Sequence, residues 1–381
     1  MSAWVLLLVP VLAIAATPSR PGETLIFEDD FNTFDFTKWK HEITQSGGGN
    51  WEFEVYVNNR SNSFVRNSIL HIRPRLTTEW LGPLDSGSLD LWGGELSDAC
   101  TGPMMSGCHR DGSPTNYLPP ITSARLRTAE AFAFKYGRVE ARPPASGCSA
   151  LLPTGVELGR GKWDSTAAYG NWPASGEIDI MESRGNRNYP ASLGGGLDTF
   201  GSTLHWGPNG QYNGWSQTHA EYRLPQGADF GAAFHVFGLY WDQLGLYTYI
   251  DEPSQVVMAV NFTDASFWDK GNKMYDFVGK HLDNPWEGGP SGAPFDQKFF
   301  LILNLAVGGL GGYFSDEAPG KPWRNGSPTA VRDFWQAQKQ WLPSWGPGLD
   351  AALQVDWVRV WALDGRTDPD TAGWFAQSRP K

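Results

Sequence analysis

The chain has 381 residues, a formal net charge of −11 and a charged fraction of only 19%. The negative balance argues against nucleic acid and anionic membranes as partners, because both bind basic surfaces. The 19 Trp and 12 Tyr exceed what a core alone would use, and amphipathic rings of this kind often line clefts.

The N-terminus predicts secretion. Residues 4–16 form an apolar run too short to span a membrane, and Ala13-Ile14-Ala15 has the small residues of a cleavage site. We therefore expect a signal peptide over residues 1–16, a short leader over residues 17–24 and an extracellular mature protein. No later stretch of the sequence approaches the length of a transmembrane helix, so no membrane partner is expected.

The rest of the chain has the pattern of an all-β protein. Gly and Pro are spread along its length, as turns between strands would be. One helix is predicted over residues 327–341, with Ser327 as its N-cap and Pro328 at the first helical position. We expect a sandwich of two antiparallel sheets in one domain over residues 25–364, with a polar tail over residues 365–381. The runs rich in Tyr, Phe, Val, Ile and Trp that predict strands are 68–73, 134–142, 234–241, 246–250, 299–307 and 355–361.

The cysteines and the sequons fit an extracellular protein. Cys100 and Cys108 flank a short loop rich in Gly, Pro, Met and Ser, which predicts a local disulfide. Cys148 is then left as a free thiol. The candidate N-glycosylation sites are Asn59, Asn261 and Asn325, and the Pro that follows the third sequon should lower its use.

The segment GEIDIMES, residues 176–183, places three carboxylates in a run that otherwise resembles a buried strand. Side chains alternate along a strand, so Glu177 and Asp179 share a face while Glu182 would point the other way. A β-bulge near Ile180-Met181 would bring all three acids to one face. Glu177 and Glu182 would then have Cα atoms about 13 Å apart. Side chains leaning together would approach the separation of about 5–5.5 Å that a retaining glycosidase needs.

The alternative for these acids is that they simply meet solvent. Three acids on one face beside Trp172, His205 and Trp206 favour chemistry instead. Crowded carboxylates repel, so the pKa of at least one should be raised. A general acid working near neutral pH needs such a raised pKa.

The stretch GNWPASGEIDIMESRGN resembles the catalytic signature of glycoside hydrolase family 16, in its laminarinase-like branch. The likeness continues in order through LDLWGG, SARLRT, KYGRVEAR, LHWGP, LILNLAVGG and VDWVRVW. Enzymes of this branch cut β-1,3-glucans, and the branch also holds the invertebrate β-1,3-glucan-binding, or Gram-negative-bacteria-binding, recognition proteins. The resemblance implies a concanavalin A-like β-jelly-roll with a long cleft across one sheet.

The resemblance also implies roles for single residues. Glu177 would be the nucleophile, Glu182 the acid/base, and Asp179 would hydrogen-bond within the pair. No catalytic cofactor is implied, and a structural Ca²⁺ is allowed without identified ligands. For Trp51 and Trp206, packing in the core is an equal alternative to sugar binding. The implied substrate-binding residues are Trp172 as a stacking ring, Asn50, Trp51 and Arg60 at the non-reducing end, His205 and Trp206 on a neighbouring strand, and Asn304.

Two functions of different class follow from this resemblance. The first is a secreted, monomeric, retaining endo-β-1,3-glucanase, which the three intact acids favour. The second is a non-catalytic pattern-recognition protein of innate immunity that binds β-1,3-glucan or lipopolysaccharide. The segment 143–170 favours the second function, because it lacks the Trp-rich strand that the family carries there and has Cys148 in place of an aromatic residue.

Overall fold

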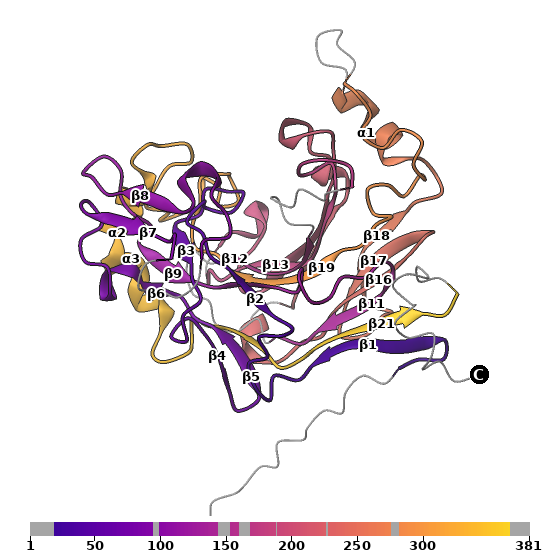
Figure 1. The fold of residues 1–381 in the computed structure, drawn as a ribbon, viewed down its shortest axis with the longest axis horizontal. Helices are drawn as coiled ribbons and strands as arrows, with labels where there is room; N and C mark the ends of the chain where they lie inside the picture. The colour runs from indigo at the N-terminus through magenta and orange to yellow at the C-terminus, as the bar shows by residue number, and fades with distance from the viewer. Residues whose placement is uncertain are drawn as a thin grey trace, which may run out of the picture.

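Two stacked antiparallel sheets form the centre of the molecule (Figure 1). The computed structural model describes residues 19–93, 99–143, 168–187, 189–225, 228–275 and 282–365, together with the backbone course of residues 153–159. One sheet has six strands in the order β1-β21-β11-β16-β17-β18, and the other has seven in the order β15-β14-β13-β12-β19-β10-β2. The predicted sandwich of two antiparallel sheets is therefore confirmed. The predicted signal peptide and residues 17 and 18 of the predicted leader lie outside the described residues. The predicted start of the domain at residue 25 is two residues late, because the first strand begins at Glu23.

The elements have the following bounds. The six-stranded sheet contains β1 (Glu23–Asp29), β11 (Gly137–Ala141), β16 (Phe237–Asp242), β17 (Gly245–Ile250), β18 (Val256–Asn261) and β21 (Val358–Leu363). The seven-stranded sheet contains β2 (Lys40–Glu42), β10 (Arg125–Arg127), β12 (Pro153–Gly159), β13 (Glu177–Arg184), β14 (Thr199–His205), β15 (His219–Arg223) and β19 (Phe300–Leu305). Smaller sheets are formed by β4 (Ser63–Arg66), β5 (Ile69–Ile72) and β20 (Leu353–Val355), by β3 (Glu54–Tyr56), β6 (Arg75–Leu76) and β9 (Ile121–Ser123), and by β7 (Ser88–Asp90) and β8 (His109–Asp111). The helices are α1 (Phe267–Tyr275), α2 (Ala330–Gln336) and α3 (Gln338–Trp341), and short 3₁₀ turns are η1 (Thr77–Glu79), η2 (Met104–Ser106), η3 (Ala191–Leu193), η4 (Gly210–Tyr212), η5 (Trp215–Gln217), η6 (Phe230–Ala232) and η7 (Leu342–Trp345).

The main core lies between the two large sheets. Leu301, Leu303 and Leu305 alternate along β19 and belong to this core, together with Ile178 of β13 and Val360 of β21. Because strand side chains alternate, the residues between them belong to the opposite face of the seven-stranded sheet. Full burial of one such side chain stabilises the fold by about 1.5–3 kcal/mol. The seven-stranded sheet therefore has one apolar face packed inward and one face left for polar groups.

Two flanking regions rise on either side of the seven-stranded sheet (Figure 1). One contains β3, β6, β7, β8 and β9 with helices α2 and α3, and the other carries α1. The first has a small apolar core of its own, formed by Ile43, Val55, Val57, Leu84, Leu89, Leu91 and Leu118. The predicted disulfide is confirmed here, since Cys100 and Cys108 are bonded with Cα atoms 5.6 Å apart. Cys148 lies outside the described residues.

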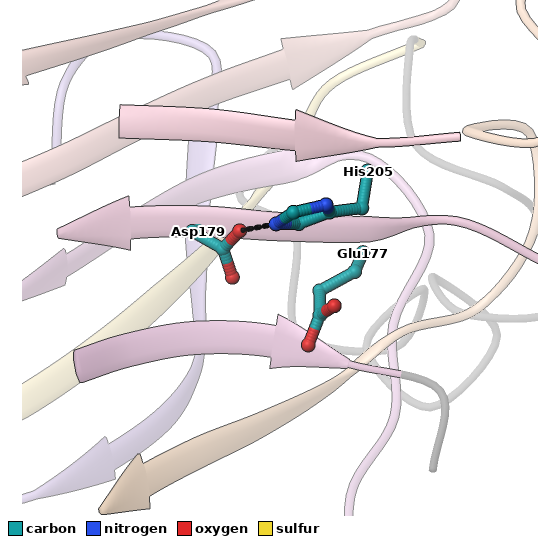
Figure 2. A group of neighbouring side chains, drawn as sticks. All are labelled: Glu177, Asp179 and His205. Atoms are coloured by element: carbon teal, nitrogen blue, oxygen red, sulfur yellow. Dashed lines mark ion pairs between the residues drawn. The ribbon is translucent and has the colours of Figure 1, made fainter. Parts of the chain in front are cut away.

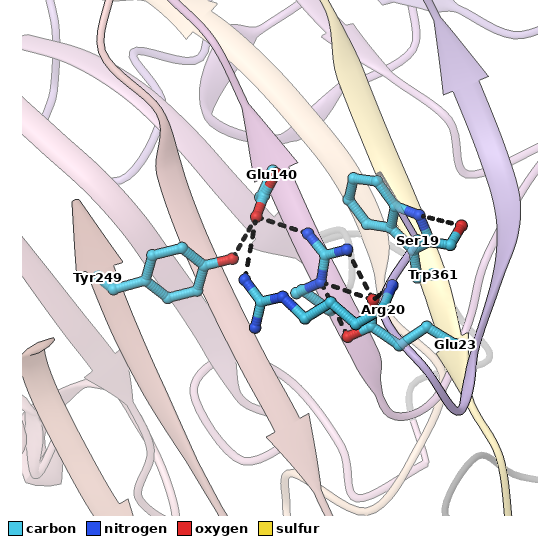
Figure 3. A network of polar contacts seen from close by, with 7 residues as sticks. Ser19, Arg20, Glu23, Glu140, Tyr249 and Trp361 are labelled. Atoms are coloured by element: carbon cyan, nitrogen blue, oxygen red, sulfur yellow. Dashed lines mark hydrogen bonds and ion pairs between the residues drawn. The ribbon is translucent and has the colours of Figure 1, made fainter. Parts of the chain in front are cut away.

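The outer face of the six-stranded sheet carries a buried ionic network (Figure 3). Arg138 donates hydrogen bonds to Glu23 at 2.9 Å and to Glu140 at 2.5 Å, and its guanidinium lies 3.6 Å from the ring centre of Trp361. Tyr249 donates to the same oxygen of Glu140 at 2.6 Å, and burial raises the pKa of this phenol. The network joins β1, β11, β17 and β21 across the sheet.

The predicted helix over residues 327–341 is wrong at its start and in its continuity. Helix α2 begins at Ala330, and α3 begins at Gln338 after a break at Ala337. Ser327 is not the N-cap, because the helix begins three residues later, at Ala330. The Ser327 hydroxyl accepts from the backbone N–H of Thr329 at 3.2 Å and closes a turn before the helix. Thr329 takes the cap position and donates its hydroxyl to Asp333 at 2.6 Å.

Other predictions need smaller corrections. The single strand expected over residues 355–361 is two strands, β20 and β21, which belong to different sheets. Helix α1 was not predicted. Among the described residues, no helix is long and apolar enough to cross a membrane.

The three sequons differ in how they are presented. The asparagines at 59 and 261 are exposed, which suits the attachment of a glycan. Asn325 is half-buried and uses both ends of its amide, donating to the Phe314 carbonyl at 2.9 Å and accepting from Lys321 at 2.7 Å. Glycosylation itself stays a prediction, with Asn59 and Asn261 the better candidates.

Candidate active site

A β-bulge in strand β13 brings the acidic motif onto one face. Between Asp179 and Glu182, two residues of β13, Ile180 and Met181, stand opposite one residue of β14, Ser202. Ile180 and Met181 are both buried in the core. The Ser202 hydroxyl donates to the Ile180 carbonyl at 2.7 Å, which satisfies a polar group that the bulge takes out of the regular ladder. The bulge predicted from the spacing of the acids is therefore confirmed.

The register of the seven-stranded sheet shows what surrounds the acids. Residues directly opposite each other on neighbouring strands share a face. The segment 143–170 does contribute a strand, β12, between β13 and β19, although its side chains lie outside what the structure describes. The pairs on the polar face are Glu177 with His205, Asp179 with Thr203, and Glu182 with Gly201, and the last row continues through Gly155 to Asn304.

The carboxylate of Glu177 is in contact with a tryptophan indole. The indole Nε1–H of Trp172 donates to Oε2 of Glu177 at 2.5 Å. The loop that carries Trp172 is held by Trp286, whose indole N–H donates to the Ala174 carbonyl at 2.7 Å. A donated hydrogen bond stabilises the ionised carboxylate, which is the form that a nucleophile needs. Trp172 was predicted only as a stacking ring, and the structure gives it this second contact.

Asp179 is held by the imidazole of His205, whose Nε2 lies 3.2 Å from Oδ2 of Asp179 (Figure 2). Asn213 contacts the other ring nitrogen, Nδ1, at 2.7 Å. The Asn213 Oδ1 accepts from the backbone N–H of Trp215 at 3.2 Å, so its amide NH₂ must face the ring. Nδ1 is therefore the acceptor, and the hydrogen is on Nε2, the nitrogen that lies beside Asp179.

Glu182 lines a cavity of about 450 Å³ above β13, β14 and β15. The volume lies within the range typical of small-ligand sites. Asn50, Trp172 and His205 also line it, so three predicted binding residues lie with the acid/base candidate. The remaining lining residues are Arg184, Leu193, Gly194, Thr199, Gly201, Thr203, Asn213, Trp215, His219, Glu221, Gly311, Gly312 and Tyr313.

Tyr313 and Arg184 form a charged wall of this cavity. The Arg184 guanidinium donates to the Tyr313 carbonyl at 2.8 and 3.0 Å and lies 4.1 Å from the centre of its ring. Burial raises the pKa of Tyr313, Arg184 opposes the rise, and the charges of Glu182 and Asp179 add to it. The phenol therefore keeps its proton and can donate a hydrogen bond within the cavity.

The structure corrects or qualifies four of the predicted binding residues. The prediction that Trp206 contacts sugar was wrong, because this side chain is fully buried. Its ring packs on Phe267 with ring centres 5.1 Å apart, and its indole N–H donates to the Thr218 hydroxyl. Asn304 is also buried, and its amide donates to the Tyr56 hydroxyl at 3.2 Å.

Trp51 and Arg60 lie outside that cavity. Trp51 is 50% exposed, which excludes the core alternative for its ring. Arg60 is exposed, packs its guanidinium 4.6 Å from the ring centre of Phe34 and contacts His41 at 3.2 Å. Contact with glucan stays a prediction for both residues.

Sequence reasoning missed several residues of this site, namely Ser202, Asn213, Trp215, His219, Glu221 and Tyr313. Only Ser202, His219 and Glu221 could have been found from the local sequence. They lie in TFGSTLH and THAEYR, where small and polar residues alternate as in a strand. The others come from loops whose course depends on the whole fold.

The acids also have the geometry of a metal-binding group. One atom from each of Glu177, Asp179 and His205 lies within 4.8 Å of the others. A hydrogen bond from Trp172 already engages Glu177, His205 pairs with Asp179, and two acids are what glycoside hydrolysis itself requires. Structural calcium, with ligands elsewhere, stays a prediction.

Sequence comparison places the chain among known relatives. No protein-family model matches the chain. The β-1,3-glucan-binding protein of Penaeus monodon is 49% identical over 352 residues, which cover 89% of this chain and 90% of that protein. The chain belongs to the β-1,3-glucan-binding protein family, in the laminarinase-like branch of glycoside hydrolase family 16. β-1,3-glucan-binding protein 1 of Manduca sexta is 32% identical over 356 residues, which cover 89% of this chain but only 65% of that longer protein.

Enzymes are also among the proteins similar to this family member. Glucan endo-1,3-β-glucosidase A1 of Niallia circulans is 29% identical over 308 residues, which cover 77% of this chain and 35% of that protein. The endo-β-1,3-glucanase structure from Pyrococcus furiosus matches with a TM-score of 0.54 at 24% identity, covering 90% of this chain and 95% of that one. The predicted β-jelly-roll fold is thereby confirmed.

Proposed function

We propose that this protein is a secreted, retaining endo-β-1,3-glucanase. The observation that carries the proposal is the bulge in β13, which presents Glu177, Asp179 and Glu182 on one face beside a 450 Å³ cavity. Similar proteins are named for binding or cutting β-1,3-glucan, and this likeness supports the choice of substrate. The apolar N-terminal run supports secretion.

In the proposed mechanism, the two outer acids have different tasks. Glu177, whose carboxylate is held by the Trp172 indole, attacks the anomeric carbon and forms a covalent glycosyl-enzyme. Glu182 donates its proton to the departing glycosidic oxygen and then removes a proton from the water that hydrolyses the intermediate. Asp179 lies between them on the strand and pairs with His205, so its carboxyl group is positioned close to the developing positive charge on the sugar.

The second candidate is a recognition protein that binds β-1,3-glucan without cutting it. The observation that favours it is that the relatives of highest identity described above are named for binding. The three acids are all present here, with Trp172 bonded to Glu177 and His205 beside Asp179, which favours hydrolysis.

Incubation of the purified protein with laminarin distinguishes the two candidates. We expect new reducing ends from the wild type and none above background from Glu177→Gln, while both proteins sediment with insoluble β-1,3-glucan. Binding without any release of reducing ends by the wild type would favour the recognition protein. Equal activity of wild type and Glu177→Gln would remove Glu177 from the mechanism.

A further inference from the structure

A row of side chains on the polar face continues from the catalytic strand to the edge of the sheet. Glu182 pairs with Gly201 on β14, and Gly201 pairs with Glu221 on β15. The two carboxylates therefore share a face, with a residue that has no side chain between them. Their Cα atoms are separated by two strand spacings, about 10 Å. The surface at Gly201 therefore separates Glu182, the acid/base candidate, from Glu221. Glu221 is a fourth acid that the proposed mechanism does not use.

His219 lies next to this fourth acid. Its Nδ1 contacts the Thr203 hydroxyl at 2.9 Å, and its Nε2 lies 3.8 Å from Oε1 of Glu221. The ring leans over Gly201, where an added Cβ would lie only 2.8 Å from Cε1 of His219, so a larger residue there would displace the ring. Burial lowers the pKa of His219, Glu221 opposes this, and Arg184 adds to it. A neutral imidazole and a carboxylate together offer hydrogen bonds of both kinds to hydroxyl groups.

Trp215 closes the same end of the cavity. Its indole is 45% exposed although it lines the cavity, and it stands at 81° to the His219 ring with centres 5.7 Å apart. Its backbone N–H is bonded to Asn213, which also contacts His205, so the ring is fixed relative to the catalytic strand. An exposed, fixed aromatic ring beside hydroxyl-binding groups is the arrangement that an amphipathic sugar ring fits.

We infer that Trp215, Glu221 and His219 form a subsite for a glucosyl unit on the leaving-group side of the scissile bond. The side is assigned from the strand order. Asn50, which the resemblance places at the non-reducing end, contacts the loop after β19 through its carbonyl, and β14 and β15 lie on the opposite side of β13. Trp215 stacks on the pyranose ring, and Glu221 and His219 hydrogen-bond to its hydroxyls. This inference rests on the proposed function.

The test uses laminarihexaose with an ¹⁸O label at its reducing end and the full-length protein. We expect Trp215→Ala and Glu221→Gln to lower kcat/KM for the hexaose by roughly tenfold, since one stacking ring or one charge-assisted hydrogen bond is removed. The first cleavage should also shift toward shorter labelled fragments. Hydrolysis of p-nitrophenyl β-laminaribioside, which has no sugar on the leaving side, should stay within twofold of wild type.

Matched control variants exist elsewhere on the surface. Trp80 is 45% exposed, as Trp215 is, and the Glu79 side chain is 39% exposed, as that of Glu221 is. Trp80→Ala and Glu79→Gln should leave both substrates unaffected. An unchanged cleavage pattern and rate in the subsite variants would overturn the inference, and so would an equal loss on the aryl substrate.

The outcome also separates this inference from the proposed function. If the wild type binds laminarihexaose but does not cut it, the glucanase proposal fails. Calorimetry then still supports the subsite if Trp215→Ala weakens binding roughly tenfold and Trp80→Ala does not. If the variants bind as tightly as the wild type, the subsite fails on its own. A wild type that neither binds nor cuts the hexaose overturns both.

Discussion

The contact between His205 and Asp179 gives a sharp test of how the site is organised. His205→Phe keeps the shape of the ring but removes the nitrogen that lies 3.2 Å from the buried Asp179 carboxylate. If this contact becomes a full hydrogen bond to a charged group during the reaction, it contributes about 1.5–3 kcal/mol. If this contribution is expressed in the transition state, kcat/KM for laminarin falls about 10- to 150-fold, at 1.36 kcal/mol for each factor of ten.

The assay is the initial rate of reducing-end release, with thermal unfolding as a check that the variant is folded. The matched control is Asn213→Ala, which removes the partner of Nδ1 and the acceptor of the Trp215 backbone N–H but leaves the Nε2 nitrogen beside Asp179 in place. We expect this control to lose less than a factor of ten. A rate within twofold of wild type for His205→Phe, or a larger loss for Asn213→Ala, would refute the reasoning.

Three further predictions concern the fold around the site. Ser202→Ala leaves the Ile180 carbonyl of the bulge without its donor, so it should cost about 1–3 kcal/mol of unfolding free energy in urea and lower activity; a stable, fully active variant would contradict this. Arg138→Met leaves the buried Glu140 with only the more distant Arg20, at 4.0 Å, as a counter-ion and should cost about 3–5 kcal/mol, while the double variant with Glu140→Gln should recover part of the loss. No recovery would argue against a poorly compensated charge as the cause. Burial and, to a lesser degree, the nearby charge of Arg60 lower the pKa of His41 to about 3. Between about pH 6.5 and 3, His41 therefore binds a proton in the unfolded chain but not in the folded protein. The free energy of unfolding should fall as the pH falls through that window. Denaturant unfolding at pH 7 and 4.5 should show a smaller loss for His41→Phe than for wild type, and equal losses would count against the assignment.

The catalytic motif was predictable because its geometry is local. Three acids at fixed spacing in one strand require only the alternation of side chains and one bulge, and both are properties of a few consecutive residues. The register confirms this arrangement around Ile180 and Met181. The same alternation could have corrected one error, since His205 and Trp206 are consecutive and a strand sends consecutive side chains to opposite faces.

The walls of the cavity were not predictable in this way. Trp206 and Trp215 are the same residue type nine positions apart, yet one is in the core and the other closes the cavity. Tyr313 comes from a loop more than 100 residues after the motif, and its place depends on how that loop crosses the sheet. Local sequence carries little information about such contacts, because loop courses are set by tertiary packing.

The helix boundary failed for a different reason. Ser327 and Thr329 are both good cap residues, and the sequence around them does not distinguish the two positions. The choice is decided by the Thr329–Asp333 bond and by the turn that Ser327 closes.

Proton NMR of the first products from laminarin tests the central claim most directly, because it reports on the roles of Glu177 and Glu182 together. Two successive inversions at the anomeric carbon restore its configuration, so the β-anomer should appear first and convert to the α-anomer only by mutarotation. The Glu177→Gln variant should yield neither anomer above background. An initial α-anomer would mean that Glu177 activates water instead of attacking carbon, and no product at all from the wild type would mean that the site binds glucan without cutting it.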